Sequence, residues 1–205
     1  MSKQNYIVYD YETGGLNPKT NPVTEVAMIA IHGETLEEIG RYTSFVQPYA
    51  DLGYDQRALD ITGITMEMIN SGKDAKTVVK EMIEFIVKFG KGRSKKPIMC
   101  GHKITTFDNP FSEVLFKFAK KDFWKFVNSE VFIDTMWWSR MKSPIDADDH
   151  GKHALVAACN REGIELTDGH RAMNDTASNA QLVIRYLKAF RGAGESVVVV
   201  AKHSY

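Results

Sequence analysis

Apolar and β-branched positions predict that the chain begins with three β-strands. Residues Tyr6–Thr13 (YIVYDYET) are rich in aromatic and β-branched side chains and run into two consecutive glycines, which is typical of a strand that ends in a turn. Residues 23–32 and 39–47 have a similar strand-like character, and Gly33 lies between them. The short connection favours an antiparallel pair, so we expect the three strands to form a meander.

Apolar residues at helical spacing dominate the rest of the chain and alternate with two short strands. Helices are predicted over residues 65–70, Ala75–Phe89, 110–120, 135–141, 153–162 and 174–191. Strands are predicted over residues 97–101 and 131–134, and a last one over residues 196–202. Residues 91–96 and 142–152 are expected to be surface loops. This order predicts an α/β fold in which helices flank a mixed central sheet.

The length and charge of the chain limit what kind of protein it is. Its 205 residues suit one domain, with a core over about residues 5–191 and a short tail over residues 192–205. Lys and Arg total 26, as do Asp and Glu, so the formal net charge is zero and non-specific coating of nucleic acid is not expected. No apolar run has the length of a membrane span or signal peptide, so we expect a soluble cytoplasmic protein. Cys100 and Cys159 lie in apolar contexts and are expected to be buried thiols.

Two acidic residues lie at the end of the first predicted strand. Asp10 and Glu12 are two positions apart, so their carboxylates share one face of the strand while Tyr11 points to the other. Carboxylates this close repel each other unless a cation lies between them, and hard oxygen ligands favour Mg²⁺ or Mn²⁺. Taken alone, the pair fits a strand end with two solvated acids equally well.

Further acids stand at two predicted helix starts. Asp108 follows a buried strand, and Asp175 lies in the first turn of the helix over residues 174–191, with His170 just before it. An Asp at such a place can simply cap the helix or complement its dipole. Each of these acidic positions is therefore weak evidence of a metal site on its own, and only their combination along the chain indicates one.

Together these segments resemble the three motifs of the DEDDh family of 3′→5′ exonucleases. That family includes the DnaQ-like proofreading epsilon subunit of bacterial DNA polymerase III and ribonuclease T. The matching segments are residues 10–16 (DYETGGL), 102–108 (HKITTFD) and 170–175 (HRAMND), with weaker matches at residues 58–65, 131–135 and 153–155. Arg171 stands where the other branch of the family has a tyrosine, which favours the histidine branch. The resemblance covers nearly the whole chain and implies a ribonuclease H-like fold.

The resemblance also implies roles for the site residues. Asp10, Glu12 and Asp175 would hold the first of two divalent ions, Mg²⁺ or Mn²⁺. Asp10 would bridge to the second ion, to which Asp108 would contribute directly or through water. His170 would act as the general base that takes a proton from the attacking water.

The turn after Glu12 is expected to bind the end of the substrate. By resemblance, its backbone N–H groups would hold the terminal hydroxyl and its leucine would press against the last base. The substrate-binding residues assigned in this way are Thr13, Gly14, Gly15, Leu16 and Phe107. Two positions depart from the family: Gly14 stands where threonine is common, and Lys103 where asparagine usually follows the histidine of the second motif. Neither supplies a metal ligand, so the departures concern how the strand end is held.

Aromatic residues interleave with lysines between positions 111 and 126, and they admit two interpretations. Exposed rings beside basic residues bind single strands, whereas aromatic residues at helical spacing more often form a core. The core interpretation is favoured for most of Phe111, Phe116, Phe118, Phe123, Trp124 and Phe126. Trp137 and Trp138 remain open in the same way.

The sequence therefore predicts a metal-dependent 3′→5′ exonuclease that releases nucleoside monophosphates from single-stranded DNA. An RNA-directed exonuclease, similar to ribonuclease T or oligoribonuclease, would use the same site, because contacts to the 2′-hydroxyl cannot be located in a sequence. A catalytically silent nucleic-acid-binding subunit is a further alternative, although all five catalytic positions are present. The chain contains no polymerase region, so any polymerase partner is expected to bind non-covalently.

Overall fold

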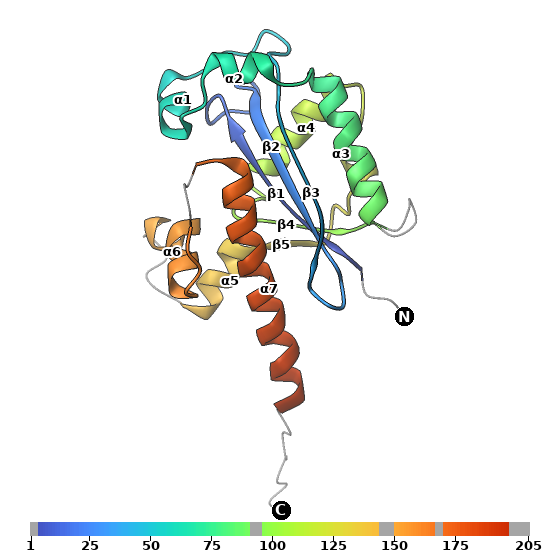
Figure 1. Cartoon of the computed structure of the whole chain (residues 1–205), viewed down its shortest axis with the longest axis vertical. Coiled ribbons are helices and arrows are strands. Elements are labelled where there is room, and N and C mark those ends of the chain that lie inside the picture. Colours follow the sequence, from blue (N-terminus) through green and yellow to red (C-terminus); the bar gives the residue numbers. More distant parts are fainter. Residues whose placement is uncertain (1–3, 91–95, 144–149, 167–169, 197–205) are drawn as a thin grey trace, which may run out of the picture.

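A five-stranded mixed sheet lies at the centre of the molecule (Figure 1). The computed structural model describes residues 4–90, 96–143, 150–166 and 170–196. Within them, β1 (Tyr6–Thr13), β2 (Val23–Ile31) and β3 (Glu38–Phe45) form the predicted antiparallel meander. β4 (Ile98–Gly101) pairs in parallel with β1, and β5 (Phe132–Asp134) in parallel with β4, which gives the order β3-β2-β1-β4-β5. The predicted α/β class and mixed sheet are confirmed.

Helices pack around this sheet at positions close to those predicted. They are α1 (Gln56–Thr62), α2 (Met66–Ser71), α3 (Ala75–Phe89), α4 (Asp108–Phe118), α5 (Thr135–Lys142), α6 (Leu155–Arg161) and α7 (Ala172–Ser196), with 3₁₀ turns η1 (Phe123–Lys125) and η2 (His150–His153). α1 was not predicted, because it has one buried residue, Leu59, and hence no apolar stripe. α7 begins earlier and ends later than expected, at Ser196 rather than at residue 191.

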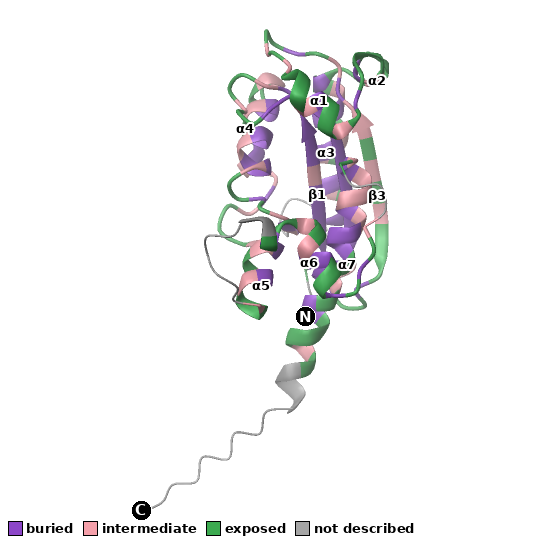
Figure 2. Cartoon of the chain, turned by 90° about the vertical axis from the view of Figure 1, so that its left-hand side faces the viewer, coloured by how far each residue is buried: buried purple, intermediate pink, exposed green. Residues whose placement is uncertain are grey.

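The two faces of β1 pack against different helices. The face toward α3 and α4 carries three apolar side chains of this strand, Ile7, Tyr9 and Tyr11. Tyr6 and Val8 point to the opposite face and pack in a cluster with residues of α7. Figure 2 shows β1 buried along most of its length. Because alternate residues share a face, Asp10 and Glu12 emerge on the side of α7.

Most of the aromatic residues are core, as expected. Phe111, Phe116 and Phe123 are buried, and Phe118, Trp124 and Phe126 pack against the same cluster. The two adjacent tryptophans differ: Trp138 packs against Tyr186 and Phe190, whereas Trp137 is 53% exposed. Cys100 and Cys159 are buried free thiols, as predicted.

Some predictions concern segments that lie outside the described residues. These are residues 91–95 of the first predicted loop, residues 144–149 at the centre of the second, and residues 197–202 of the predicted last strand. Ser196, the first residue of that predicted strand, is instead the last residue of α7. The described flanks of the second loop are more regular than predicted, because α5 continues to Lys142 and η2 begins at His150. Within the described segments, no helix combines the length and apolar character needed to cross a bilayer.

Candidate active site

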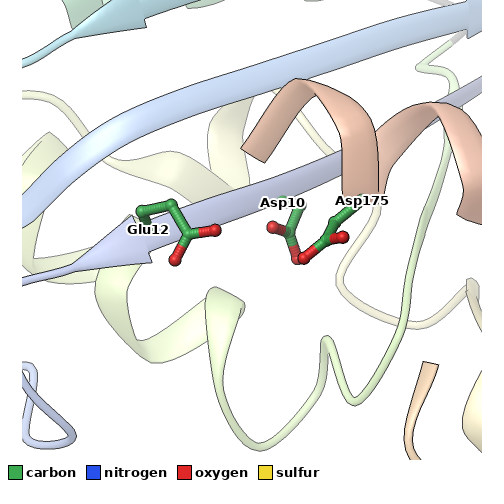
Figure 3. A group of neighbouring side chains, drawn as sticks. All are labelled: Asp10, Glu12 and Asp175. Atoms are coloured by element: carbon green, nitrogen blue, oxygen red, sulfur yellow. The ribbon is translucent and has the colours of Figure 1, made fainter. Parts of the chain in front are cut away.

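Three carboxylates from β1 and α7 converge at one point (Figure 3). Asp10, Glu12 and Asp175 each offer an oxygen atom, and these oxygens all lie within 4.8 Å of one another. The strand places the first two on the same face, and α7 brings Asp175 to them in its first turn. In Figure 3 the carboxylates of Asp10 and Asp175 face each other. The structure therefore brings together three of the five predicted catalytic residues as one acidic group.

Burial and mutual repulsion raise the pKa values of this acidic group. Loss of solvent raises the pKa of Glu12 to about 8, and the neighbouring charges of Asp175, Glu25 and Asp108 add to the effect. The pKa of Asp10 is raised well above its usual range by burial, then by Asp108, Glu12 and Asp175. The pKa of Asp175 is raised mainly by burial. Ionising the group at neutral pH is therefore costly unless a positive charge lies beside it.

The donor atoms of this group suit a divalent cation. One oxygen of Asp175, Oδ1, is buried and has no hydrogen-bond partner among the described residues, although buried acceptors usually have one. All the converging ligands are carboxylate oxygens, which Mg²⁺ and Mn²⁺ prefer and which zinc sites use less often. A hard divalent cation would both satisfy the orphaned oxygen and offset the repulsion.

Asp108 lies beside Asp10 but is held differently. It is 1% exposed, and burial raises its pKa to about 8. Its Oδ1 accepts a hydrogen bond from the backbone N–H of Tyr11 at 3.2 Å. Phe107 occupies the N-cap position of α4 and Asp108 is the first helical residue. The alternative that Asp108 serves as the helix cap is therefore wrong, and its carboxylate instead points to β1.

His170 is exposed and lies two residues before the start of α7. Its φ is 71°, in the left-handed region that few non-glycine residues adopt. Its backbone N–H donates to Oδ2 of Asp175 at 3.3 Å. The same carboxylate that belongs to the acidic group thus fixes the backbone of His170 next to it.

The turn after Glu12 is held by the protein itself. The hydroxyl of Thr13 donates to the carbonyl of Gly15 at 2.7 Å, and the N–H of Gly14 donates to the carbonyl of Pro22 at 2.8 Å. The amide of Gly14 is therefore engaged, contrary to the expectation that the amides of this turn are offered to a terminal hydroxyl. Leu16 is 83% exposed at the tip of the turn.

Tyr54 explains why position 14 is a glycine. A Cβ at this position would lie 2.9 Å from Cδ1 of Tyr54 and 3.0 Å from Cδ of Pro22. The N–H of Asp55 also donates to the carbonyl of Gly14, which holds the start of α1 against the turn. The departure from the threonine common in the family is thus matched by an aromatic ring in the space that a side chain would need.

Comparison with known proteins identifies the family. The family model RNase_T, described as an exonuclease, matches residues 7–183. The chain belongs to this exonuclease family. The PolC-type DNA polymerase III of Bacillus subtilis (strain 168) is 29% identical over 192 residues, or 92% of this chain and 12% of the polymerase. The exonuclease thus spans about an eighth of that relative.

Solved structures show the same fold. Escherichia coli exonuclease I in complex with a dT13 oligonucleotide superposes with a TM-score of 0.75 at 17% identity, covering 94% of this chain and 43% of the other. A 3′-exonuclease, from a structure described as 3′-end specific recognition of histone mRNA stem-loop, superposes with a TM-score of 0.74 at 14% identity. The match covers 92% of this chain and 84% of the other. The predicted ribonuclease H-like fold and the DnaQ-like resemblance are confirmed.

A carboxylate that the sequence did not single out anchors α7 of the exonuclease. Glu25 lies opposite Glu12 in the β1–β2 register and is 4% exposed. Its two oxygens accept from Nε and Nη2 of Arg171, each at 3.2 Å, and Oε2 also accepts from the N–H of Ala172 at 3.3 Å. The guanidinium of Arg171 in turn lies over the ring of Phe45. The one sign of this role in the sequence was that two strands expected to pair antiparallel both carry acidic residues. To place Glu25 opposite Glu12, one must also know the register of the two strands.

Removing the positive partner of Glu25 is expected to destabilise the exonuclease. In Arg171→Met, a buried carboxylate is left unpaired beside Glu12, and the free energy of unfolding should fall by about 2 kcal/mol, since the arginine side chain is partly exposed. Adding Glu25→Gln should restore much of that loss because it removes the uncompensated charge. Urea denaturation of the two single variants and the double variant measures this coupling.

A matched control is the exposed pair of Lys73 and Glu81, whose ion-pair distance is 2.7 Å. Lys73→Met should lower stability by less than about 1 kcal/mol, because both side chains remain solvated. Strictly additive effects of the Arg171 and Glu25 substitutions would contradict the proposed coupling.

The histidine of the second motif joins the elements around the site. Nε2 of His102 lies 2.8 Å from the carbonyl of His153, and Nδ1 lies 2.9 Å from Oγ1 of Thr135. Burial lowers the pKa of His102, which favours the neutral ring. A neutral ring can donate from Nε2 and accept at Nδ1. His102 therefore ties the end of β4 to α5 and η2, and His153 is a buried structural residue.

Proposed function

We propose that this exonuclease removes nucleotides from the 3′ end of single-stranded DNA and releases nucleoside 5′-monophosphates. The active site consists of Asp10, Glu12, Asp108, His170 and Asp175. The convergence of three carboxylates within 4.8 Å, with one orphaned oxygen, carries the proposal. The dT13 oligonucleotide bound by the similar exonuclease I supports a single strand as the substrate.

The acidic residues would hold two divalent ions. Asp10, Glu12 and Asp175 would bind one Mg²⁺ or Mn²⁺, and Asp10 with Asp108 the other. When bound, such ions lower the pKa of water and stabilise the attacking and leaving oxygens of a phosphodiester. Without them, the raised pKa values of Glu12 and Asp108 show how poorly the site tolerates its own negative charge.

His170 would supply the base of the hydrolysis. Its imidazole takes a proton from the water whose oxygen forms the new bond to phosphorus. The bond from phosphorus to the 3′ oxygen of the preceding nucleotide breaks, and that oxygen leaves as a hydroxyl after taking a proton from solvent. The terminal nucleotide would rest on Thr13, Gly14, Gly15 and Leu16, with Phe107 beside it.

RNA is the second candidate substrate. The 3′-exonuclease described with histone mRNA is as similar in fold to this chain as exonuclease I is, with TM-scores of 0.74 and 0.75. The relationship to part of a PolC-type polymerase also supports a polymerase as a binding partner. Neither relationship distinguishes the sugar that the site accepts.

Single-stranded DNA and RNA of matched sequence, labelled at the 5′ end, test the proposal. With Mg²⁺ or Mn²⁺, we expect a ladder of labelled products that shortens from the 3′ end, faster for DNA, and no products with EDTA. Gel electrophoresis over time reports direction and sugar preference together. Immediate release of the label as a mononucleotide would contradict the direction, and faster loss of RNA would make RNA the substrate.

A further inference from the structure

A cleft opens beside the acidic group on the side of β4 and β5. Its volume is about 690 Å³, and its lining includes Asp10, Lys103, Asp108, Trp137, Arg140 and Leu155. Pockets of this size hold ligands as large as a nucleotide. The cleft meets the acidic group at Asp10, and Asp108 also lines it, while the turn at residues 13–16 follows Glu12 and is not among the described residues that line it. The acidic group thus has a ligand-sized space on the side away from the turn.

The wall that α5 contributes carries an aromatic ring and a cation on one helix face. Trp137 is 53% exposed, and the guanidinium carbon of Arg140 lies 5.2 Å from the centre of its ring. Residues three apart on a helix are neighbours, so the two side chains form one surface. An exposed ring beside a positive charge is the arrangement with which proteins stack a base and contact its phosphate.

Lys103 also lines the cleft, and its backbone conformation is unfavourable for a lysine. Its φ is 65°, in the left-handed region, and its side chain is exposed at the cleft. Lysine has no short polar side chain to stabilise this conformation, unlike asparagine. Residues held in rare conformations cluster at functional sites, and this lysine lines the same cleft as Asp10 and Asp108.

The carboxylate of Asp134 holds both Lys103 and α5 in place. Oδ1 of Asp134 accepts from the N–H of Lys103 at 2.9 Å and from the N–H of Met136 at 3.0 Å. The first bond fixes the loop that carries Lys103, and the second caps α5, which carries Trp137. The cleft is therefore a preorganised site, because its basic and aromatic groups are set by the same buried residue.

We propose that this cleft binds the nucleotide immediately 5′ to the scissile phosphate, with its base stacked on Trp137 and its 5′ phosphate contacting Lys103 and Arg140. The inference rests on the proposed function, in which the terminal nucleotide occupies the turn. The net charge of the chain is zero, so attraction to phosphate must come from local groups such as these. The exonuclease is therefore expected to act on strands, because a single nucleotide has no second nucleotide to occupy the cleft.

Two substrates separate this subsite from the terminal one. The p-nitrophenyl ester of thymidine 5′-monophosphate contains the terminal nucleotide and the scissile phosphate, but p-nitrophenolate replaces the second nucleotide as the leaving group. Trp137→Ala should lower kcat/KM about tenfold on a short oligothymidylate and leave the ester within about twofold. Lys103→Gln should likewise lower kcat/KM on the oligonucleotide and spare the ester. It should also reduce the slope of log(kcat/KM) against log salt concentration for the oligonucleotide by about 1, whereas Lys103→Arg should retain activity.

Ile39→Ala and Lys117→Gln are matched controls. Ile39 is 38% exposed on β3 and Lys117 is an exposed lysine of α4, and neither lines the cleft. Both variants should act on the two substrates as the unmodified protein does. Equal losses on the two substrates in Trp137→Ala would place the terminal nucleotide in the cleft and overturn the inference, and so would no loss on either.

A binding measurement distinguishes failure of this inference from failure of the proposed function. If the unmodified protein hydrolyses neither substrate, the proposed function is wrong. The fluorescence anisotropy of a labelled oligothymidylate, measured with Ca²⁺, then still tests the cleft. Weaker binding by Trp137→Ala and Lys103→Gln than by the two controls would support it, and equal binding would refute it.

Discussion

Asp10→Asn is expected to lower the rate of strand hydrolysis by about 10³-fold or more. Asp10 lies at the centre of the acidic group, within reach of both Asp175 and Asp108, and would be shared by the two ions. Losing several kcal/mol of metal-dependent stabilisation of the transition state corresponds to a loss of this size. Single-turnover assays on a labelled strand measure the rate, and Mn²⁺ titration by calorimetry measures the metal affinity.

The substituted asparagine has nearly the shape of the aspartate, so the comparison isolates the charge. Asp51→Asn, which changes an exposed aspartate outside the acidic group, serves as the control and should keep full activity. If Asp10→Asn retained both metal binding and turnover, the acidic group would not be the catalytic centre.

The same substitution is expected to stabilise the metal-free protein at pH 8. The pKa values of Glu12 and Asp108 are raised to about 8 in the folded protein, from ordinary values of 4.5 and 3.8. Between these limits the folded protein holds protons that the unfolded chain has released, so stability falls as pH rises from about 4 to about 8. The pKa of Asp10 is raised in the same way, so at pH 8 the folded protein bears the cost either of keeping Asp10 protonated or of ionising it beside other carboxylates. Asparagine removes both costs, and the gain at pH 8 should be about 2 kcal/mol.

Urea denaturation in EDTA from pH 5 to pH 8 measures this dependence. The stability of the unmodified protein should decline with rising pH more steeply than that of Asp10→Asn. Saturating Mg²⁺ should reverse the decline in the unmodified protein alone, because a ligand that binds only the folded state stabilises it. Parallel curves for the two proteins would show that repulsion within the acidic group does not limit stability.

Local periodicity was enough to predict the strands and the first half of the site. The two-residue period of a strand placed Asp10 and Glu12 on one face, and alternate packing of Tyr6 and Val8 against α7 then decided which face. That α7 delivers Asp175 to the same point depends on how the chain returns across the sheet. Only the family resemblance indicated this, since no local pattern in residues 170–175 differs from an ordinary capped helix.

Other parts of the site depend on tertiary contacts that a sequence does not express. Trp137 and Trp138 are adjacent and identical, yet one is open to the cleft and the other is packed against α7. A helix turns by about 100° per residue, so the orientation of α5 against its neighbours decides which tryptophan is exposed and which is packed. Glu25 similarly acquires its role only through the register of β1 and β2 and the approach of Arg171.

His170→Ala is expected to lower turnover by about 10²- to 10⁴-fold while metal and strand binding persist. A positioned general base contributes about this much to a rate. The contact between residue 170 and Asp175 is made by the backbone N–H, which the substitution keeps, so the acidic group should stay assembled. Pre-steady-state hydrolysis and Mn²⁺ titration of the same variant measure the two properties separately.

The left-handed backbone of His170 calls for a second variant. With φ at 71°, alanine introduces strain of its own, whereas glycine adopts this conformation freely. His170→Gly should therefore fold as well as the unmodified protein and show the same loss of rate. Added imidazole should restore part of that rate if the missing group is a base, because a free imidazole can take its place near neutral pH. Lost metal affinity without rescue would instead make His170 a positioning residue for Asp175, and unchanged turnover would remove it from the mechanism.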